Sequence, residues 1–99
     1  MFHRAVHPGL VLKDELKELG LSSTELARQI EVPANRISQI IQGKRAISGD
    51  TALRLGHWFG MQAQFWLNLQ TQYDLALAHQ KNGHLVQKLP THARQTTAV

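Results

Sequence analysis

The sequence predicts an all-α domain of five helices that is followed by a flexible tail. Apolar residues recur at helical spacing through most of the chain, and no segment before residue 84 alternates apolar and polar side chains as a strand does. Proline, serine and glycine stand at positions that begin and end short helices. With 99 residues, 42% of them hydrophobic, the chain suits one small domain. We therefore expect a helical domain over residues 1–81 and a tail over residues 82–99.

The first two helices are predicted from the residues at their ends. Pro8 fits a first helical position, apolar residues keep a helical period as far as Leu19, and Gly20 then stops the helix. A second, shorter helix opens at Ser22, because Glu25 stands three residues later in the capping-box arrangement. We expect this helix to end near Glu31.

The third helix has two sharply different faces. It is expected to begin at Pro33 and to run to Gln42, where Gly43 can adopt the left-handed conformation that often closes a helix. At about 100° per residue, one face is apolar and the opposite face carries amides and hydroxyls. The apolar face holds Ile37, Ile40 and Ile41, and the polar face holds Asn35, Ser38, Gln39 and Gln42. Arg36 lies on the flank between them.

Two further helices complete the domain. Ser48 or Asp50 can cap a fourth helix that ends at Phe59 and Gly60. The last helix is expected to begin near Ala63 and to break at residues 82–83, an Asn-Gly pair. Its inner stripe is Phe65, Trp66, Leu69, Tyr73, Ala76 and Leu77, and we expect its aromatic rings to pack with Trp58 and Phe59. Leu67 and Leu75 lie outside this stripe, which predicts a second apolar surface for a partner subunit.

The charge pattern around the third helix favours a polyanion as partner. Net charge is +4, and between Glu31 and Asp50 the only charged residues are Arg36, Lys44 and Arg45. A surface that is merely solvated usually mixes acids with bases, whereas acids here would repel phosphates. Amides can pair with base edges in the DNA major groove while cations neutralise phosphates. With the short connection between the second and third helices, the pattern predicts a DNA-binding helix-turn-helix.

Enzyme and metal chemistry are not indicated. The chain has no cysteine, and its six histidines show neither a metal-binding spacing nor a nearby pair of carboxylates. The seven acidic residues are scattered, and no glycine-rich phosphate loop is present. The given sequence does not open on a charged segment followed by an apolar one, so no leader is expected, and it has no run of about 18 apolar residues. We expect a cytoplasmic protein with no catalytic residue, cofactor, metal or membrane span.

Three segments together resemble one known family. They are "HPGLVLKDELKELGLS", "LSSTELARQIEVPANRISQIIQGKRAISGDTALRLGHWFG" and "FWLNLQTQYDL", and they are similar to the HigA group of bacterial toxin–antitoxin antitoxins, within the lambda-repressor-like, Xre-type helix-turn-helix superfamily. The resemblance covers roughly residues 7 to 78. It implies a homodimeric antitoxin that neutralises an mRNA-cleaving ribonuclease toxin and represses its own operon at a pseudo-palindromic operator. The alternatives are a stand-alone repressor without a toxin and a purely structural interaction module.

The resemblance also implies roles for individual residues. Ser23 and Thr24 would hold phosphate at the start of the second helix, although for Ser23 plain helix capping is the alternative. The groove would be entered by Asn35, Arg36, Ser38 and Gln39, while Lys44 and Arg45 would grip the DNA backbone. Gln42 lies on the same face, where simple solvent exposure is the alternative. In Xre-type regulators the region of the last helix commonly mediates dimerisation.

The sequence departs from the family pattern at two positions. Glu31 stands in the turn where the family often has glycine, so a left-handed glutamate is expected at a cost of about 1 kcal/mol. Leu10 stands where an acid is common.

The tail has two interpretations. It is acid-free and carries Lys88 and Arg94, with Lys81 just before it. It is either a frayed terminus or a toxin contact in which residues 84–89 add a strand to the toxin's sheet.

Overall fold

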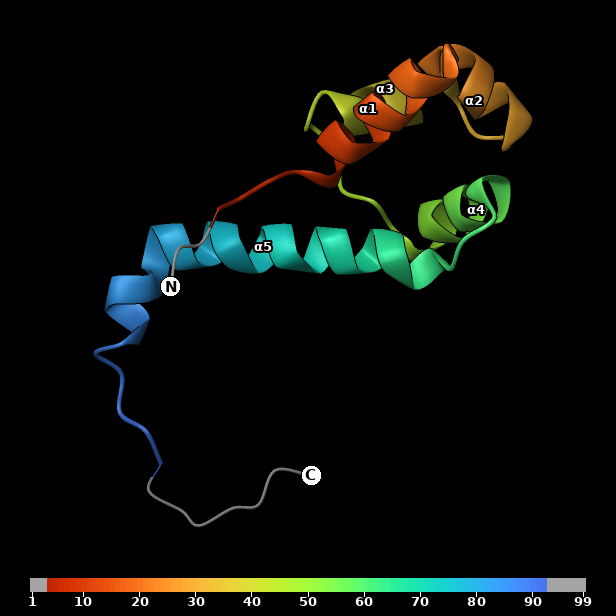
Figure 1. Cartoon of the computed structure of the whole chain (residues 1–99). Coiled ribbons are helices and arrows are strands. Elements are labelled where there is room, and N and C mark those ends of the chain that lie inside the picture. The colour runs from red at the N-terminus through yellow and green to blue at the C-terminus, as the bar shows by residue number, and fades with distance from the viewer. Residues whose placement is uncertain (1–3, 93–99) are drawn as a thin grey trace.

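The computed structural model describes residues 4–92 and shows five helices, with no strand among these residues. They are α1 (Pro8–Leu19), α2 (Ser23–Gln29), α3 (Ala34–Ile41), α4 (Gly49–Phe59) and α5 (Ala63–Val86). In Figure 1, α1, α2 and α3 lie together, α4 lies beside the beginning of α5, and the far end of α5 runs past the other helices. The predicted all-helical class with five helices is confirmed. Within the described part of the chain, no helix is both long and apolar enough to cross a membrane.

Local signals set the ends of the first four helices. Gly20, Gly43 and Gly60 all have positive φ angles, between 65° and 76°, and each follows a helix. The hydroxyl of Ser48 accepts the backbone N–H of Thr51 at 3.3 Å, so the fourth cap is Ser48 and not Asp50. Pro33 is extended, and α3 begins one residue later than expected. α2 ends at Gln29, two residues before the end expected near Glu31. The other bounds of these four helices agree with the capping signals to within about a residue.

Half of the expected capping box forms at α2. The hydroxyl of Ser22 accepts the backbone N–H of Glu25 at 3.1 Å. The Glu25 carboxylate accepts hydrogen bonds from the side chains of Arg28 and Gln29. The bond from Arg28 has the larger effect and that from Gln29 the smaller, and together they lower the pKa of Glu25 to about 2. The cap is Ser22, so the alternative that Ser23 acts as the helix cap is wrong, and Ser23 stands in the first turn beside Thr24.

The expected break of the last helix at residues 82–83 is wrong. α5 continues to Val86, and the Gln87 N–H still bonds to the Gly83 carbonyl at 3.0 Å. An internal glycine costs a helix only about 1 kcal/mol, whereas each added residue brings another backbone bond. Residues 84–86 are therefore helical and residues 87–89 form a turn, so the described chain has no strand over residues 84–89. Arg94 and the rest of residues 93–99 lie outside the described part.

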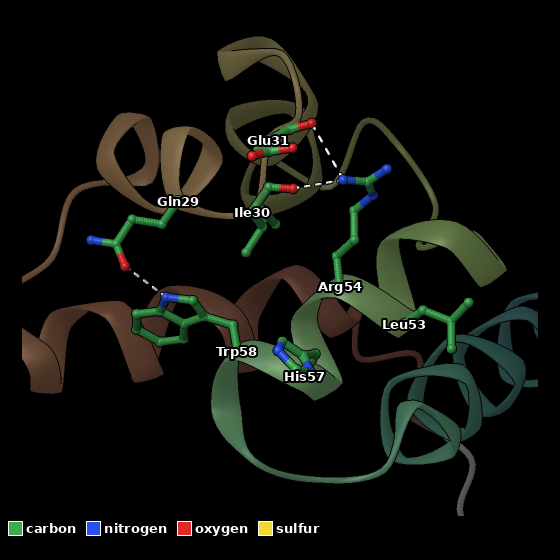
Figure 2. Close-up of a pocket in the computed structure, with 7 residues that line it drawn as sticks. All are labelled: Gln29, Ile30, Glu31, Leu53, Arg54, His57 and Trp58. Carbon is green, nitrogen blue, oxygen red and sulfur yellow. Dashed lines mark hydrogen bonds between the residues drawn. The ribbon is translucent and has the colours of Figure 1, made fainter.

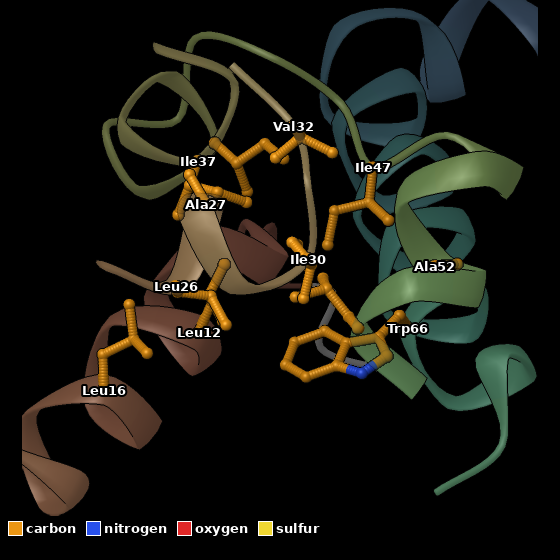
Figure 3. Packing of buried hydrophobic residues seen from close by; sticks show 12 residues of the cluster. Leu12, Leu16, Leu26, Ala27, Ile30, Val32, Ile37, Ile47, Ala52 and Trp66 are labelled. Carbon is orange, nitrogen blue, oxygen red and sulfur yellow. The ribbon is translucent and has the colours of Figure 1, made fainter. Parts of the chain in front are cut away.

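One hydrophobic core joins all five helices (Figure 3). Ile37 and Ile40 of α3 are fully buried, as expected for its apolar face, and Ile41 packs partly against the core. The core consists of Leu12, Leu16, Leu26, Ala27, Ile30, Val32, Ile37, Ile40, Ile47, Ala52, Leu55 and Trp66. α3 is thus fixed by its apolar side, and its polar side is left at the surface.

The aromatic rings contact each other as expected, but the placement of Phe65 on the inner stripe is wrong, because its side chain is 41% exposed. Ring centroids are 4.8 Å apart for Trp58 and Phe59, 5.5 Å for Phe59 and Trp66, and 5.2 Å for Phe65 and Trp66. The expectation that Leu67 lies outside the inner surface of the last helix is wrong, because its side chain is half-buried and packs against the core. Trp66, Leu67 and Leu69 all contact the core, so the start of α5 packs over more than one stripe of its surface.

The turn between α2 and α3 is held by α4. Glu31 has a φ of 59°, which confirms the left-handed conformation expected for it. Arg54 of α4 donates from Nη1 to the carbonyl of Ile30 at 2.8 Å and to that of Glu31 at 3.4 Å. Ile30 and Val32, on either side of Glu31, are buried. A cation at the end of α2 also suits the negative end of the helix dipole.

Substitutions at Glu31 should change stability in opposite directions. Glu31→Gly removes the steric cost of a left-handed side chain, partly offset by the greater entropy that glycine loses, so the free energy of unfolding should rise by about 0.5 kcal/mol. Glu31→Val puts a β-branched side chain at positive φ and should lower it by about 1–2 kcal/mol. Urea unfolding measures both. Equal stability of the two variants would contradict a left-handed residue at this position.

Candidate nucleic-acid interface

The polar face of α3 lies at the surface. Asn35 and Gln42 are exposed, and Ser38 and Gln39 are half-exposed, while the isoleucines of the same helix face the core. The Ser38 hydroxyl donates to the Asn35 carbonyl at 3.3 Å. The division of α3 into two faces is as the sequence predicts, and its surface side carries amide and hydroxyl groups suited to base edges.

The loop after α3 continues this polar face. Lys44 and Arg45 are exposed, and the left-handed Gly43 turns the chain so that both follow directly from α3. Arg45 donates from Nε to Oε1 of Gln39 at 2.9 Å. This charge-assisted hydrogen bond holds a cation suited to phosphate next to an amide suited to a base edge.

Buried Gln70 of α5 anchors the same loop. Its Oε1 accepts the backbone N–H of Ile47 at 2.8 Å, and its Nε2 donates to Oδ1 of Asp74 at 3.0 Å. Gln70 is only 7% exposed, so this amide is part of the interior. This role of Gln70 could not be predicted from the sequence, because a lone glutamine in a helix carries no sign of a partner 23 residues away.

His7 ties the start of α1 to the loop and to α5. Its Nδ1 accepts the backbone N–H of Gly9 at 2.9 Å, which caps α1, and its ring makes an edge contact with Tyr73 at 4.8 Å. Burial is the largest influence on the pKa of His7 and lowers it, against a hydrogen bond with the backbone of Arg45 and the charge of Asp74. A neutral imidazole is required for this cap, since a protonated Nδ1 cannot accept a hydrogen bond.

Gly9 allows α1 to touch the backbone of α3. A Cβ atom at this position would lie 1.9 Å from the carbonyl oxygen of Ile40. Real side chains never come so close, so only glycine fits here without moving one of the two helices. This contact fixes the end of α3 from which the cationic loop departs.

Arg36 does not stand free on the flank of α3. It donates from Nη1 to Oδ2 of Asp50 at 3.0 Å, and the same oxygen accepts Nε of Arg54 at 3.0 Å. The segment between Glu31 and Asp50 is free of acids in the sequence, but folding brings Asp50 against Arg36. Asp50, which only marks the end of this segment in the sequence, therefore lies beside the polar face of α3 in the folded chain.

A pocket of about 300 Å³ lies between the end of α2 and α4 (Figure 2). Its polar groups bind each other: Trp58 donates from Nε1 to Oε1 of Gln29 at 2.8 Å, and Arg54 donates to the turn carbonyls. The polar groups of the pocket therefore connect α4 to the end of α2 and to the turn that follows it. Among residues 4–92, no three histidine, aspartate or glutamate side chains are grouped so that they could hold a metal ion.

Three comparisons with known proteins bear on this arrangement. A helix-turn-helix family model, HTH_3, matches residues 12–60. The chain is 46% identical to Virulence-associated protein I of Dichelobacter nodosus, over 91% of this chain and 86% of that protein. A HigA-family addiction module antidote protein from Coxiella burnetii superposes with a TM-score of 0.88 and 43% identity, over 90% of this chain and 98% of the other. The Pseudomonas aeruginosa antitoxin HigA, solved with the higBA promoter, gives a TM-score of 0.84 and 43% identity, over 88% and 97% of the two chains.

Proposed function

The chain belongs to the Xre-type helix-turn-helix family that includes the HigA antitoxins, a family of DNA-binding regulators and antitoxins and not of enzymes. From this premise we propose that it is an antitoxin that binds the operator of its own operon and neutralises a toxin encoded with it. One observation carries the proposal: a surface of amides, hydroxyls and cations on α3 and the following loop, in a fold shared with an antitoxin solved with its promoter.

The DNA contacts are assigned from this surface. Asn35, Ser38, Gln39 and Gln42 face the bases of the major groove, and Arg36 enters beside them. Lys44 and Arg45 bind phosphates at one end of α3, and Ser23 and Thr24 do so from the first turn of α2. Exposure of Asn35 and Lys44, together with the Arg45–Gln39 bond, supports this assignment.

Substitutions on α3 and on its loop should have different effects. Asn35→Ala or Gln39→Ala should cost about 1–3 kcal/mol on the operator and relax base preference, because an amide pair to a base edge is lost. Lys44→Ala should weaken operator and random DNA alike and make the salt dependence shallower by about 0.9, the share of one phosphate. Titrating each variant into labelled upstream DNA and into a shuffled duplex, at several salt concentrations, measures the operator affinity, the random-DNA affinity and the salt dependence. If the double variant lacking both amides binds the operator as the wild type does, α3 is not the reader.

We propose that two copies pair through α5. Leu75 is 67% exposed, and a groove of about 370 Å³ lies on the same side of the helix. Its lining is Leu75, Ala78, His79, Asn82, Gly83, Val86 and Gln87. These residues recur every three or four positions, as on a helix face that receives another helix. Leu67 contributes mainly to the core of its own subunit, so Leu75 is the stronger candidate contact. A two-fold dimer would place its α3 helices about 34 Å apart, on the halves of a pseudo-palindrome.

A charge at Leu75 should therefore shift the protein to the monomer. Leu75→Glu should raise the dimer dissociation constant at least about tenfold, since a buried charge at an interface is costly. Leu53→Glu on α4 is the matched control, because Leu53 is exposed to a similar extent, 66%, but lies on another helix. Sedimentation velocity measures both. A wild-type-like dimer in the Leu75 variant would mean that the interface lies elsewhere.

The second partner in the proposal is the toxin, an mRNA-cleaving ribonuclease. After Asp74 the described chain carries Lys81 and Lys88 and no acid, which supports a role for this end in meeting another surface. Addition of residues 84–89 to a toxin sheet would first require the end of α5 to unwind, because residues 84–86 are helical in the free chain.

Co-expression with the product of the adjacent gene tests this part of the proposal. An antitoxin should co-purify with that product, relieve its toxicity and keep its own operator binding. A stand-alone repressor, the alternative, would bind the operator and retain no neighbour. A variant ending at Leu89 keeps all of α5, so a loss of toxin binding in this variant would assign the contact to the last ten residues.

A further inference from the structure

Asp50 accepts two arginines on a single oxygen. Its Oδ2 receives Nη1 of Arg36 from α3 and Nε of Arg54 from α4, both at 3.0 Å. Arg54 also donates to the carbonyls of Ile30 and Glu31. A continuous chain of bonds thus runs from the helix-turn-helix turn, through α4, to the first turn of α3.

This geometry differs from that of an ordinary surface ion pair. An exposed pair between two long, mobile side chains contributes little, but here the carboxylate stands in the first turn of α4 and is held by a second arginine. The Arg36 side chain is only 28% exposed, compared with 71% for Arg28 in the pair on α2. Arg36 is therefore restrained on the flank of the polar face.

The pairing changes how Arg36 can meet DNA. A carboxylate and a phosphate compete for the same guanidinium, and a fixed acid beside the surface also repels the phosphate backbone. One of the five guanidinium N–H groups is used by Asp50, so the others remain for a base edge presented at the right place. The Asp50 carboxylate repels an anionic phosphate that approaches these free N–H groups, whereas it does not repel an uncharged base edge.

We propose that Asp50 is a specificity-determining residue, which suppresses phosphate binding by Arg36 on random DNA and orients the same side chain toward operator bases. The inference rests on the proposed role of α3 as DNA reader. Asp50 does not itself contact DNA; it acts through Arg36.

Asp50→Asn tests the proposal with little change in shape. On random DNA at about 0.15 M salt, binding should become on the order of fourfold tighter and the salt dependence steeper by about 0.9, the contribution of one added phosphate contact. Operator binding should not gain by the same factor, so the ratio of operator to random affinity should fall. Asp14→Asn on α1 is the matched control, because it removes the same charge from an exposed position on another helix.

A second substitution assigns the effect to Arg36. Adding Arg36→Ala to Asp50→Asn should abolish the gain on random DNA, and thermal unfolding should show that each variant is folded. If Asp50→Asn does not fold, Asp50→Ser provides the same comparison with a residue that suits the start of a helix. The inference is overturned if the Asp50 and Asp14 variants have the same affinity and salt dependence, or if the gain survives Arg36→Ala. A wild-type protein that binds no upstream DNA would instead overturn the proposed function itself.

Discussion

The orientation of α3 depends on the left-handed turn at Glu31. A residue with positive φ reverses the chain within one position, and Ile30 and Val32 on either side enter the core, so the angle between α2 and α3 is set by three residues. Two backbone carbonyls at this point have no partner within α2, and Arg54 of α4 supplies their hydrogen bonds. Without that arginine the turn would combine backbone strain with poorly satisfied carbonyls. The surface proposed to meet DNA is therefore held from behind by α4.

The cationic loop has a second, independent support. Gln70 binds the backbone of Ile47 from α5, and His7 reaches the backbone of Arg45 from the start of α1. Tyr73 contacts His7 one turn further along α5. The helix proposed to join two subunits is thus the same helix that positions the loop proposed to bind phosphates. A displacement of α5 would move Lys44 and Arg45 relative to the polar face of α3.

Features of this protein that depend on residues close together in the sequence were predictable, and those that depend on distant residues were not. Helix ends at Gly20, Ser22 and Gly60 were predictable, because a cap is formed by residues two to four positions apart. The two faces of α3 were predictable for the same reason. The end of α5 was not, because the Asn-Gly pair is a turn signal whose small cost a long helix absorbs. Pairing of Arg36 with Asp50 spans 14 residues and that of Gln70 with Ile47 spans 23, so neither leaves a local pattern.

Because Gly9 packs against the backbone of Ile40, the position of α3 does not depend on the side chains that α3 turns outward. α3 is located by its isoleucines and by a main-chain atom of its last turn, so Asn35 and Gln42 carry none of the packing. Their identities can change without moving the helix. Duplicated copies of such a gene in one genome could therefore diverge in the DNA sequence they recognise while keeping the same fold, which would insulate each regulatory circuit from its neighbours.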